Sequence, residues 1–317
     1  MDRNGRNTGI SAALASALFL GLTPIFGKQA LLTGFSPLAV VTLRTGMAAT
    51  LLIAAMTVFQ RKFFYIYPVG LIGCILAGFL NGLGSILYYT ALNRLDASVG
   101  HLIYSFYPLF VALLQRVDSQ SIGRLTVFRL LLSVPGVYLL VSAGQQNVDW
   151  LGSGLMLASA FLYALHLLVN QRVLYEVPAP TVTLYTLISM TATVSVAFSI
   201  FDRGLPPAGT PWWPILGMAA ITFLSRITLF MGVKHLGGMQ TALLGLGELL
   251  VTVFLAQMWL GEYMNYLQWI GALLLGSSLF LIGFDQQSPP KRYTTGWLAW
   301  LNPPGIRPDD LPWNSNP

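Results

Sequence analysis

The sequence predicts an all-α membrane protein whose ten transmembrane helices form two inverted five-helix repeats. Only 9% of the 317 residues are charged, whereas a soluble domain carries about 25% and needs them on its surface. Ten apolar stretches follow one another, most of them near the roughly 20 residues that a helix needs to cross a bilayer. The first five stretches begin at points that match those of the last five. Together these observations argue against a water-soluble domain.

Short linkers rich in glycine and proline separate the apolar segments. Because a backbone inside lipid cannot bond to water, segments this long without strand-like alternation are expected to be helical. The first segment is also too long for the apolar part of a cleavable signal. The expected segments are residues 8–32, 37–59, 67–91, 97–116, 125–143, 150–174, 180–201, 213–236, 239–260 and 265–284.

A shift of 143 residues aligns the two halves of the chain. It places Leu14-Ala15-Ser16-Ala17 on the identical run Leu157-Ala158-Ser159-Ala160, and Pro37 on Pro180. Five helices are an odd number, so the second repeat must run opposite to the first, as in transporters that alternate access around a midplane site. The expected division is a first five-helix repeat (1–146), a second five-helix repeat (147–285) and an irregular cytoplasmic tail (286–317).

Lysine and arginine residues fall mainly on one side of this topology. If the N-terminus is cytoplasmic, twelve of them face the cytoplasm and Lys28, Arg94 and Arg203 face outside, which is the bias expected of cytoplasmic loops. We expect a multi-pass protein of the bacterial plasma membrane, and this bias favours both termini in the cytoplasm. The basic residues are scattered singly, so the net charge of +6 does not indicate a nucleic-acid partner. The twelve are Arg3, Arg6, Arg61, Lys62, Arg116, Arg124, Arg129, Arg172, Lys234, Lys291, Arg292 and Arg307.

Two charges lie deep in adjacent apolar segments. Arg226 is ten residues before Leu236, and Glu248 is nine residues after Met239. At a rise of about 1.5 Å per residue, both lie roughly 14–15 Å from the same membrane face. An unpaired charge there costs at least ~2.5–3.5 kcal/mol. The two residues therefore indicate either a buried polar site or a purely structural ion pair, and the sequence leaves both alternatives open.

Other polar residues inside the apolar segments extend this site. Arg44, Tyr88 and Tyr104 are expected toward the outer side, and Asn81 and His166 near the midplane. Polar and ionisable residues inside a membrane mark substrate or ion pathways. The candidate substrate-binding residues are Arg44, Asn81, Tyr88, Tyr104, His166, Arg226 and Glu248.

Structural roles are open alternatives for several groups. Lys28 could extend to the headgroups, Arg44 could hold loop carbonyls, and His166 could either relay protons or hydrogen-bond a neighbouring helix. His101, four residues into its segment, is expected to be an interfacial histidine. Cys74 is the single cysteine and the three histidines lie in different segments, so we expect neither a metal site nor a cofactor.

A series of short motifs runs through both halves. They are Thr23-Pro24-Ile25-Phe26-Gly27-Lys28, Phe35-Ser36-Pro37, Tyr88-Tyr89-Thr90-Ala91-Leu92, Tyr107-Pro108, Lys234-His235-Leu236-Gly237-Gly238, Leu260-Gly261-Glu262 and Gln268-Trp269-Ile270-Gly271. In this order the chain resembles the drug/metabolite transporter superfamily, specifically its EamA-type members with ten helices, over about residues 8–285. The resemblance implies export of small metabolites such as amino acids. The family often has Glu-Pro in segments four and nine, whereas this chain has Tyr107-Pro108 and Glu248-Leu249.

The sequence therefore predicts a secondary transporter rather than an enzyme, because it has no nucleotide-binding motif and no clustered catalytic set. Three intramembrane cations against one acid favour an anionic or zwitterionic metabolite such as an amino acid, exported or exchanged by alternating access around a midplane site. Glu248 is the acid placed deepest, so proton coupling through a carboxylate would use it. The alternative is a non-transporting membrane scaffold or receptor, and the sequence leaves open whether the chain is a homodimer.

Overall fold

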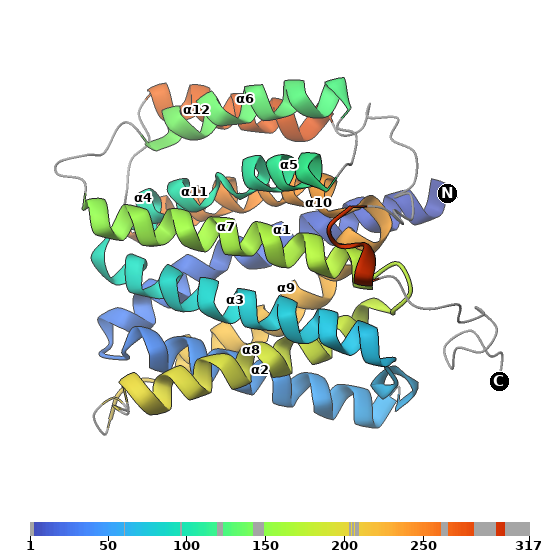
Figure 1. Cartoon of the computed structure of the whole chain (residues 1–317). Helices are drawn as coiled ribbons and strands as arrows, with labels where there is room; N and C mark the ends of the chain where they lie inside the picture. The colour runs from blue at the N-terminus through green and yellow to red at the C-terminus, as the bar shows by residue number, and fades with distance from the viewer. Residues whose placement is uncertain are drawn as a thin grey trace.

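Every secondary-structure element that the computed structural model describes is helical (Figure 1). The described residues are 3–59, 61–95, 97–118, 123–141, 149–202, 204, 206, 209–260, 266–281 and 296–301. The α-helices are α1 (Arg3–Leu32), α2 (Pro37–Phe59), α3 (Pro68–Arg94), α4 (Ala97–Tyr104), α5 (Tyr107–Val117), α6 (Arg124–Val141), α7 (Trp150–Val173), α8 (Ala179–Phe201), α9 (Trp213–Leu236), α10 (Gly238–Gly245), α11 (Gly247–Leu260) and α12 (Tyr266–Phe280), with short 3-10 helices η1 (Arg61–Phe64) and η3 (Ala299–Leu301).

Six of the described helices, α1, α2, α3, α7, α8 and α9, are long and apolar enough to cross a membrane. This confirms the prediction of an all-helical, multi-pass membrane protein. Shorter apolar helical stretches lie at Tyr107–Val117, Val127–Gly136, Gln240–Thr252 and Trp269–Ser278. That all ten segments cross the membrane as inverted repeats stays a prediction.

The fourth and ninth expected segments are each broken into two helices, which differs from the continuous helices that the sequence predicts. The first break, at Ser105-Phe106, precedes Pro108 in the first turn of α5, and proline cannot continue a helix through its own position without losing a hydrogen bond. The second break, at Leu246, lies between Gly245 and Gly247, and glycine weakens a helix by roughly 1 kcal/mol. Figure 1 shows the four pieces together in the bundle interior.

The pieces of the two broken segments contact each other in pairs, α5 with α10 and α4 with α11. The Tyr107 hydroxyl in α5 donates to the Ala242 carbonyl in α10 at 3.0 Å, and α4 lies beside α11. Interrupted helices leave backbone groups and helix ends free in the membrane interior, where they commonly form transport sites. The breaks therefore position the polar residues described below.

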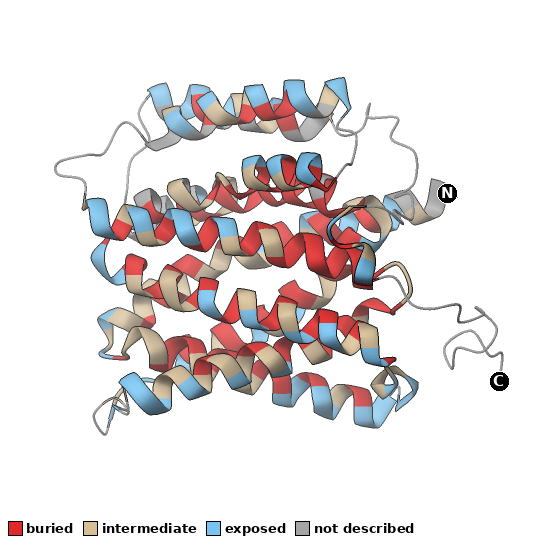
Figure 2. Cartoon of the chain, in the orientation of Figure 1, coloured by how far each residue is buried: buried red, intermediate tan, exposed pale blue. Residues whose placement is uncertain are grey.

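Buried residues face the interior of the bundle and exposed apolar residues cover its rim (Figure 2). Leu51, Phe79 and Leu131 are among the large apolar side chains that stay exposed, as a lipid-facing surface requires. Glycines bring α3 close to α8, because a side chain at Gly78 would collide with Ser189 and the Thr186 carbonyl. Small residues serve this purpose in membrane helices.

Three cations that the sequence places in loops or near headgroups are engaged inside the bundle. Lys28 donates to the Leu92 and Leu95 carbonyls at 3.1 and 3.2 Å, so it caps the end of α3 rather than extending to the headgroups. Arg129 is fully buried and its Nε donates to the Ser278 carbonyl at 3.0 Å. Arg172 is also buried. Without these three residues the basic bias of the expected loops is ten to two.

Several expectations lie outside the described residues. These are both predicted domain boundaries, near 146–147 and 285–286, the loop residues Arg203, Lys291, Arg292 and Arg307, the Leu-Gly-Glu motif residue Glu262, and the tail apart from 296–301.

Candidate functional site

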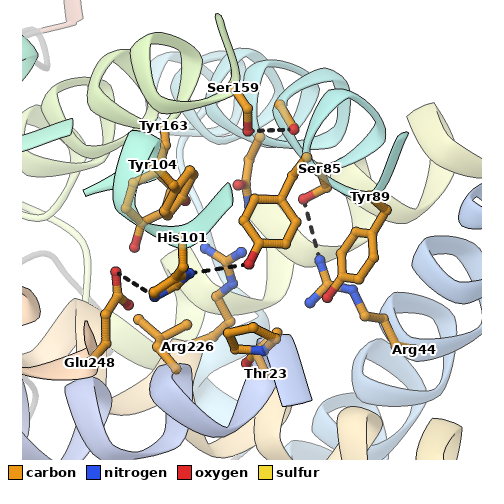
Figure 3. Close-up of a pocket in the computed structure, with 15 residues that line it drawn as sticks. Thr23, Arg44, Ser85, Tyr89, His101, Tyr104, Ser159, Tyr163, Arg226 and Glu248 are labelled. Atoms are coloured by element: carbon orange, nitrogen blue, oxygen red, sulfur yellow. Dashed lines mark hydrogen bonds and ion pairs between the residues drawn. The ribbon is translucent and has the colours of Figure 1, made fainter. Parts of the chain in front are cut away.

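A cavity with polar lining residues lies where α1, α2, α3, α4, α7, α9 and α11 meet (Figure 3). Six of the seven candidate residues line it. The seventh, His166, is not a lining residue but hydrogen-bonds to Arg226, which is one. The lining residues are Leu20, Thr23, Pro24, Arg44, Asn81, Gly84, Ser85, Tyr88, Tyr89, His101, Tyr104, Ser159, Tyr163, Arg226 and Glu248.

Arg44 of α2 is held by three neighbours on one side of the cavity. Its guanidinium donates to the Thr222 and Ser85 hydroxyls, both at 3.3 Å, and its carbon Cζ lies 5.0 Å from the centre of the Tyr89 ring. Gly27 of α1 makes room for this ring, because a Cβ there would lie 2.8 Å from Tyr89 Cε1. Arg44 therefore contacts side chains of the bundle rather than loop carbonyls, which was the structural alternative.

Arg226 of α9 is oriented by Asn81 and His166. With its amide oxygen turned toward the guanidinium, Asn81 accepts hydrogen bonds from both terminal nitrogens at 3.1 and 2.8 Å. His166 Nδ1 donates to the Ala77 carbonyl at 2.9 Å, so its Nε2 is free to accept from Arg226 at 3.3 Å. Both ring nitrogens of His166 are thus used, which fits the hydrogen-bonding alternative better than the proton relay.

Glu248 lies in the first turn of α11, just after the second helix break, where the positive end of a helix favours an acidic side chain. Its Oε1 lies 3.8 Å from His101 Nε2, and the Tyr88 hydroxyl lies 3.2 Å from His101 Nδ1. His101 is buried, because α4 lies within the bundle beside α11. That His101 lies at the membrane interface stays a prediction.

The ion pair between Arg226 and Glu248, which the sequence leaves open as one alternative, does not form between these two described residues. Glu248 faces His101, whereas Arg226 contacts Asn81 and His166. Both residues nevertheless line the same cavity. Of the two alternatives that the sequence leaves open, the geometry favours a buried polar site.

Tyrosine rings form one wall between these charged groups. Tyr104 packs against Tyr88, Tyr107 and Tyr163 with ring centroids 5.1, 5.6 and 5.5 Å apart, and it stacks on His101 at 5.9 Å. Aromatic faces can hold an apolar group or a cation beside polar groups. The cavity thus combines charged groups with an aromatic, polarizable wall.

Four buried polar atoms on lining residues have no hydrogen-bond partner among the described residues: Arg44 Nε, Tyr89 Oη, His101 Nε2 and Glu248 Oε1. Buried polar groups are almost always paired, so such atoms at a cavity wall are available to a bound molecule. Figure 3 shows Glu248 and His101 at one side of the cavity, Arg44 and Tyr89 at the other, and Arg226 between them. The site has two cationic groups and one acidic group.

Sequence reasoning missed His101, Tyr163 and the hydroxyls of Thr23, Ser85 and Ser159. Ser85 lies four residues after Asn81 and four before Tyr89, so it shares a helix face with two polar residues. That spacing was a usable signal for Ser85. No comparable signal marks His101, because its position depends on the helix break.

Comparisons with known proteins agree with this architecture. A model of the EamA-like transporter family matches residues 7–142 and again residues 150–284. An uncharacterized transporter of Synechocystis sp. is 27% identical over 231 residues, covering 68% of this chain and 67% of that protein. The uncharacterized transporter YcbK of Bacillus subtilis is 21% identical over 211 residues, covering 63% and 67%.

Two further similarities are more limited. GDP-fucose transporter 1 of Dictyostelium discoideum is 26% identical over 147 residues, which are 44% of this chain and 40% of that protein. A solved crystal structure superposes with a TM-score of 0.70 at 16% identity, covering 88% of this chain and 97% of the other. At that identity the likeness concerns the fold alone.

Proposed function

Because the chain belongs to the EamA-like transporter family, we propose that it is a secondary transporter that exports or exchanges a small anionic or zwitterionic metabolite, such as an amino acid. Substrate would bind in the polar cavity and reach the two sides of the membrane by alternating access. One observation carries the proposal: a buried cavity at the junction of two broken helices is lined by Arg44, Arg226 and Glu248, with polar atoms left unpaired.

The charges of the cavity support this substrate class. Arg44 and Arg226 offer hydrogen-bond donors to a carboxylate or another anionic group, and planar guanidinium groups bind such groups well. Glu248 offers acceptor oxygens at the other side, beside His101, suited to an ammonium group or a hydroxyl. A molecule carrying both kinds of group would satisfy both sides of the cavity, whereas a lipophilic cation would face two arginines.

Proton coupling through Glu248 is part of the proposal. A carboxylate beside a cationic or hydrogen-bonding partner can remain charged, whereas the same group in apolar surroundings favours its protonated form. Movement of α11 relative to α4 during alternating access would change the partner of Glu248, so that it takes up a proton in one facing state and releases it in the other. His101, 3.8 Å away, is the neighbour most directly affected by that change.

The membrane arrangement that we propose has ten transmembrane segments in two inverted repeats, with both termini in the cytoplasm of a bacterial cell. Two consecutive matches to the same family model and breaks in both the fourth and the ninth segments support a repeated architecture. The basic bias of the loops supports the orientation, because the cations that remain in loops still favour one side.

Transport assays with purified protein in liposomes test the proposal. We expect uptake of a radiolabelled amino acid by wild-type protein and strong loss in Arg44→Gln and Arg226→Gln. Arg61→Gln is the matched control, because Arg61 is an exposed arginine of η1 outside the cavity. Normal transport by both cavity variants would contradict the proposed site. A complete lack of transport across a panel of amino acids and other metabolic anions would instead favour a scaffold or receptor.

A further inference from the structure

The C-terminal segment 296–301 folds back onto one end of the bundle, whereas the sequence predicts an irregular tail. Leu298 and Leu301 are 0% and 1% exposed and belong to the large hydrophobic cluster at that end. Trp297 and Trp300 point outward and stay about half exposed, at 44% and 50%. Figure 1 shows this segment, in red, beside the end of α7. The alternation of buried and exposed residues is that of a docked element.

Leu301 fills a space that a glycine leaves open on α3. A Cβ added at Gly73 would lie 3.1 Å from Leu301 Cδ2 and 2.5 Å from Val173 Cγ2. The absence of a side chain at this position thus lets Leu301 pack where the beginning of α3 meets the end of α7. The same two helices carry cavity residues further along, among them Ser85 of α3 and Tyr163 of α7.

The segment also covers a buried ion pair. Arg172, near the end of α7, donates to Asp118 Oδ2, just after α5, at 2.5 Å, and both side chains are almost fully buried. The backbone N–H of Leu298 donates to the other carboxylate oxygen of Asp118 at 3.4 Å. Gly296, with φ +100°, lies so close that a side chain there would collide with the Asp118 carboxylate. Buried ion pairs resist separation while water is kept away from them.

We infer that segment 296–301 is a latch that holds this end of the bundle closed and must leave its seat before the cavity can open there. The inference rests on the proposed alternating access. It follows from position: Asn81, which lines the cavity, is eight residues beyond Gly73, about 12 Å along the helix. Opening the cavity toward this end would therefore require α3 and α7, which pack against each other, to move apart there. The latch bridges those two helices and shields the ion pair that joins α7 to the end of α5.

Thiol labelling tests the latch without any substrate. Cys74 is the single cysteine of the chain and is fully buried in the same cluster as Leu298 and Leu301. A chain ending at Thr295 should react with a maleimide on the order of tenfold faster than the full chain, because loss of a docked segment shifts the opening equilibrium by such factors. A chain ending at Leu301 is the matched control and should react like the full chain. Equal rates for both truncated chains would overturn the latch.

A reversible cross-link in the full-length chain gives an independent test. Val173→Cys and Leu301→Cys, in a Cys74→Ala background, place two thiols around the space beside Gly73. Oxidation to the disulfide should reduce transport in liposomes at least about tenfold, and a reductant should restore it. Undiminished transport by the oxidised protein would refute the latch. If wild-type protein transports nothing, the proposed function fails while the labelling experiment still decides whether the segment closes this end.

Discussion

His101 Nε2 and Glu248 Oε1 face each other across 3.8 Å in the bundle interior, and neither atom has a hydrogen-bond partner among the described residues. The two residues come from α4 and α11, the broken halves of segments that are far apart in the sequence. A separation of 3.8 Å is beyond hydrogen-bond length, so a water molecule or a substrate group that lies to one side of the pair could contact both atoms. Proton transfer through Glu248 would therefore involve this pair.

Glu248→Gln should separate substrate transport from proton coupling. Glutamine keeps the shape of the side chain but has no carboxyl group that can take up or release a proton. In liposomes we expect wild-type flux to respond to an imposed pH gradient, and flux by the variant to lose this response while substrate exchange persists. Wild-type flux that ignores the gradient would exclude the proton mechanism and leave Glu248 as a substrate contact or structural residue.

The absence of an ion pair between Arg226 and Glu248 predicts additive effects. Arg226→Met and Glu248→Gln should each lower the unfolding free energy, and the double variant should match their sum within about 0.5 kcal/mol. A direct buried pair would behave differently, because each single change would strand a charge at about 3–5 kcal/mol while the double change could be nearly neutral. Denaturant unfolding in detergent measures all four proteins. Strong rescue in the double variant would mean that the two residues pair in another state.

Arg44→Lys should raise KM for the substrate by on the order of tenfold or more. Lysine keeps the charge but cannot donate to both Ser85 and Thr222 while lying over the Tyr89 ring as the planar guanidinium does. Hydrogen bonds of charged groups are worth about 1.5–3 kcal/mol, which sets that scale. Concentration-dependent uptake measures the change, with Arg61→Lys as the control. Unchanged KM would remove Arg44 from the site.

Asp149, at the start of α7, should make stability depend on pH. Its carboxylate accepts from Arg94 Nε at 2.6 Å and from the backbone N–H groups of Leu151 and Gly152. The hydrogen bond from Arg94, foremost, lowers the pKa of Asp149. A group whose pKa is lower in the folded state stabilises the protein above its unfolded pKa, and this stabilisation is lost as the pH falls through the folded pKa. Melting curves across acidic pH should show this decline in the wild type and less of it in Asp149→Asn.

Reporter fusions test the orientation. A reporter after Pro317 should report the cytoplasm, and one inserted at Asp149 the external side. Five membrane segments between the two positions would put them on opposite sides. If both reporters lie in the same compartment, the proposed topology is ruled out.

The sequence was sufficient to predict the long helices and most of the cavity. Low charge and long apolar runs identify helices such as α3 and α9. A membrane interior tolerates isolated polar residues only where they find partners, so residues such as Arg44 and Asn81 indicate the site. Depth along a helix placed Arg226 and Glu248 in one cavity. It could not specify whether the side chains meet, because that depends on how each helix is rotated about its axis.

The helix breaks and the docked tail were beyond sequence reasoning. Segments that are apolar all round carry no periodicity that would reveal an interruption at Leu246, and the effect of Pro108 depends on its neighbours. The position of His101 beside Glu248 could not be predicted for the same reason. Leu298 and Leu301 lie in a stretch rich in proline and tryptophan, too short to show a helical face, and their burial depends on the gap beside Gly73.

The contact between Gly27 and Tyr89 has a consequence for the evolution of related sequences. Since a methyl group at position 27 would press on the Tyr89 ring, and that ring lies against Arg44, the three positions cannot vary independently. Homologues with alanine or a larger residue at position 27 should carry a smaller residue at position 89, and those without the ring should lose the arginine more often. Substitutions at these three positions, on three different helices, should therefore occur together in related sequences.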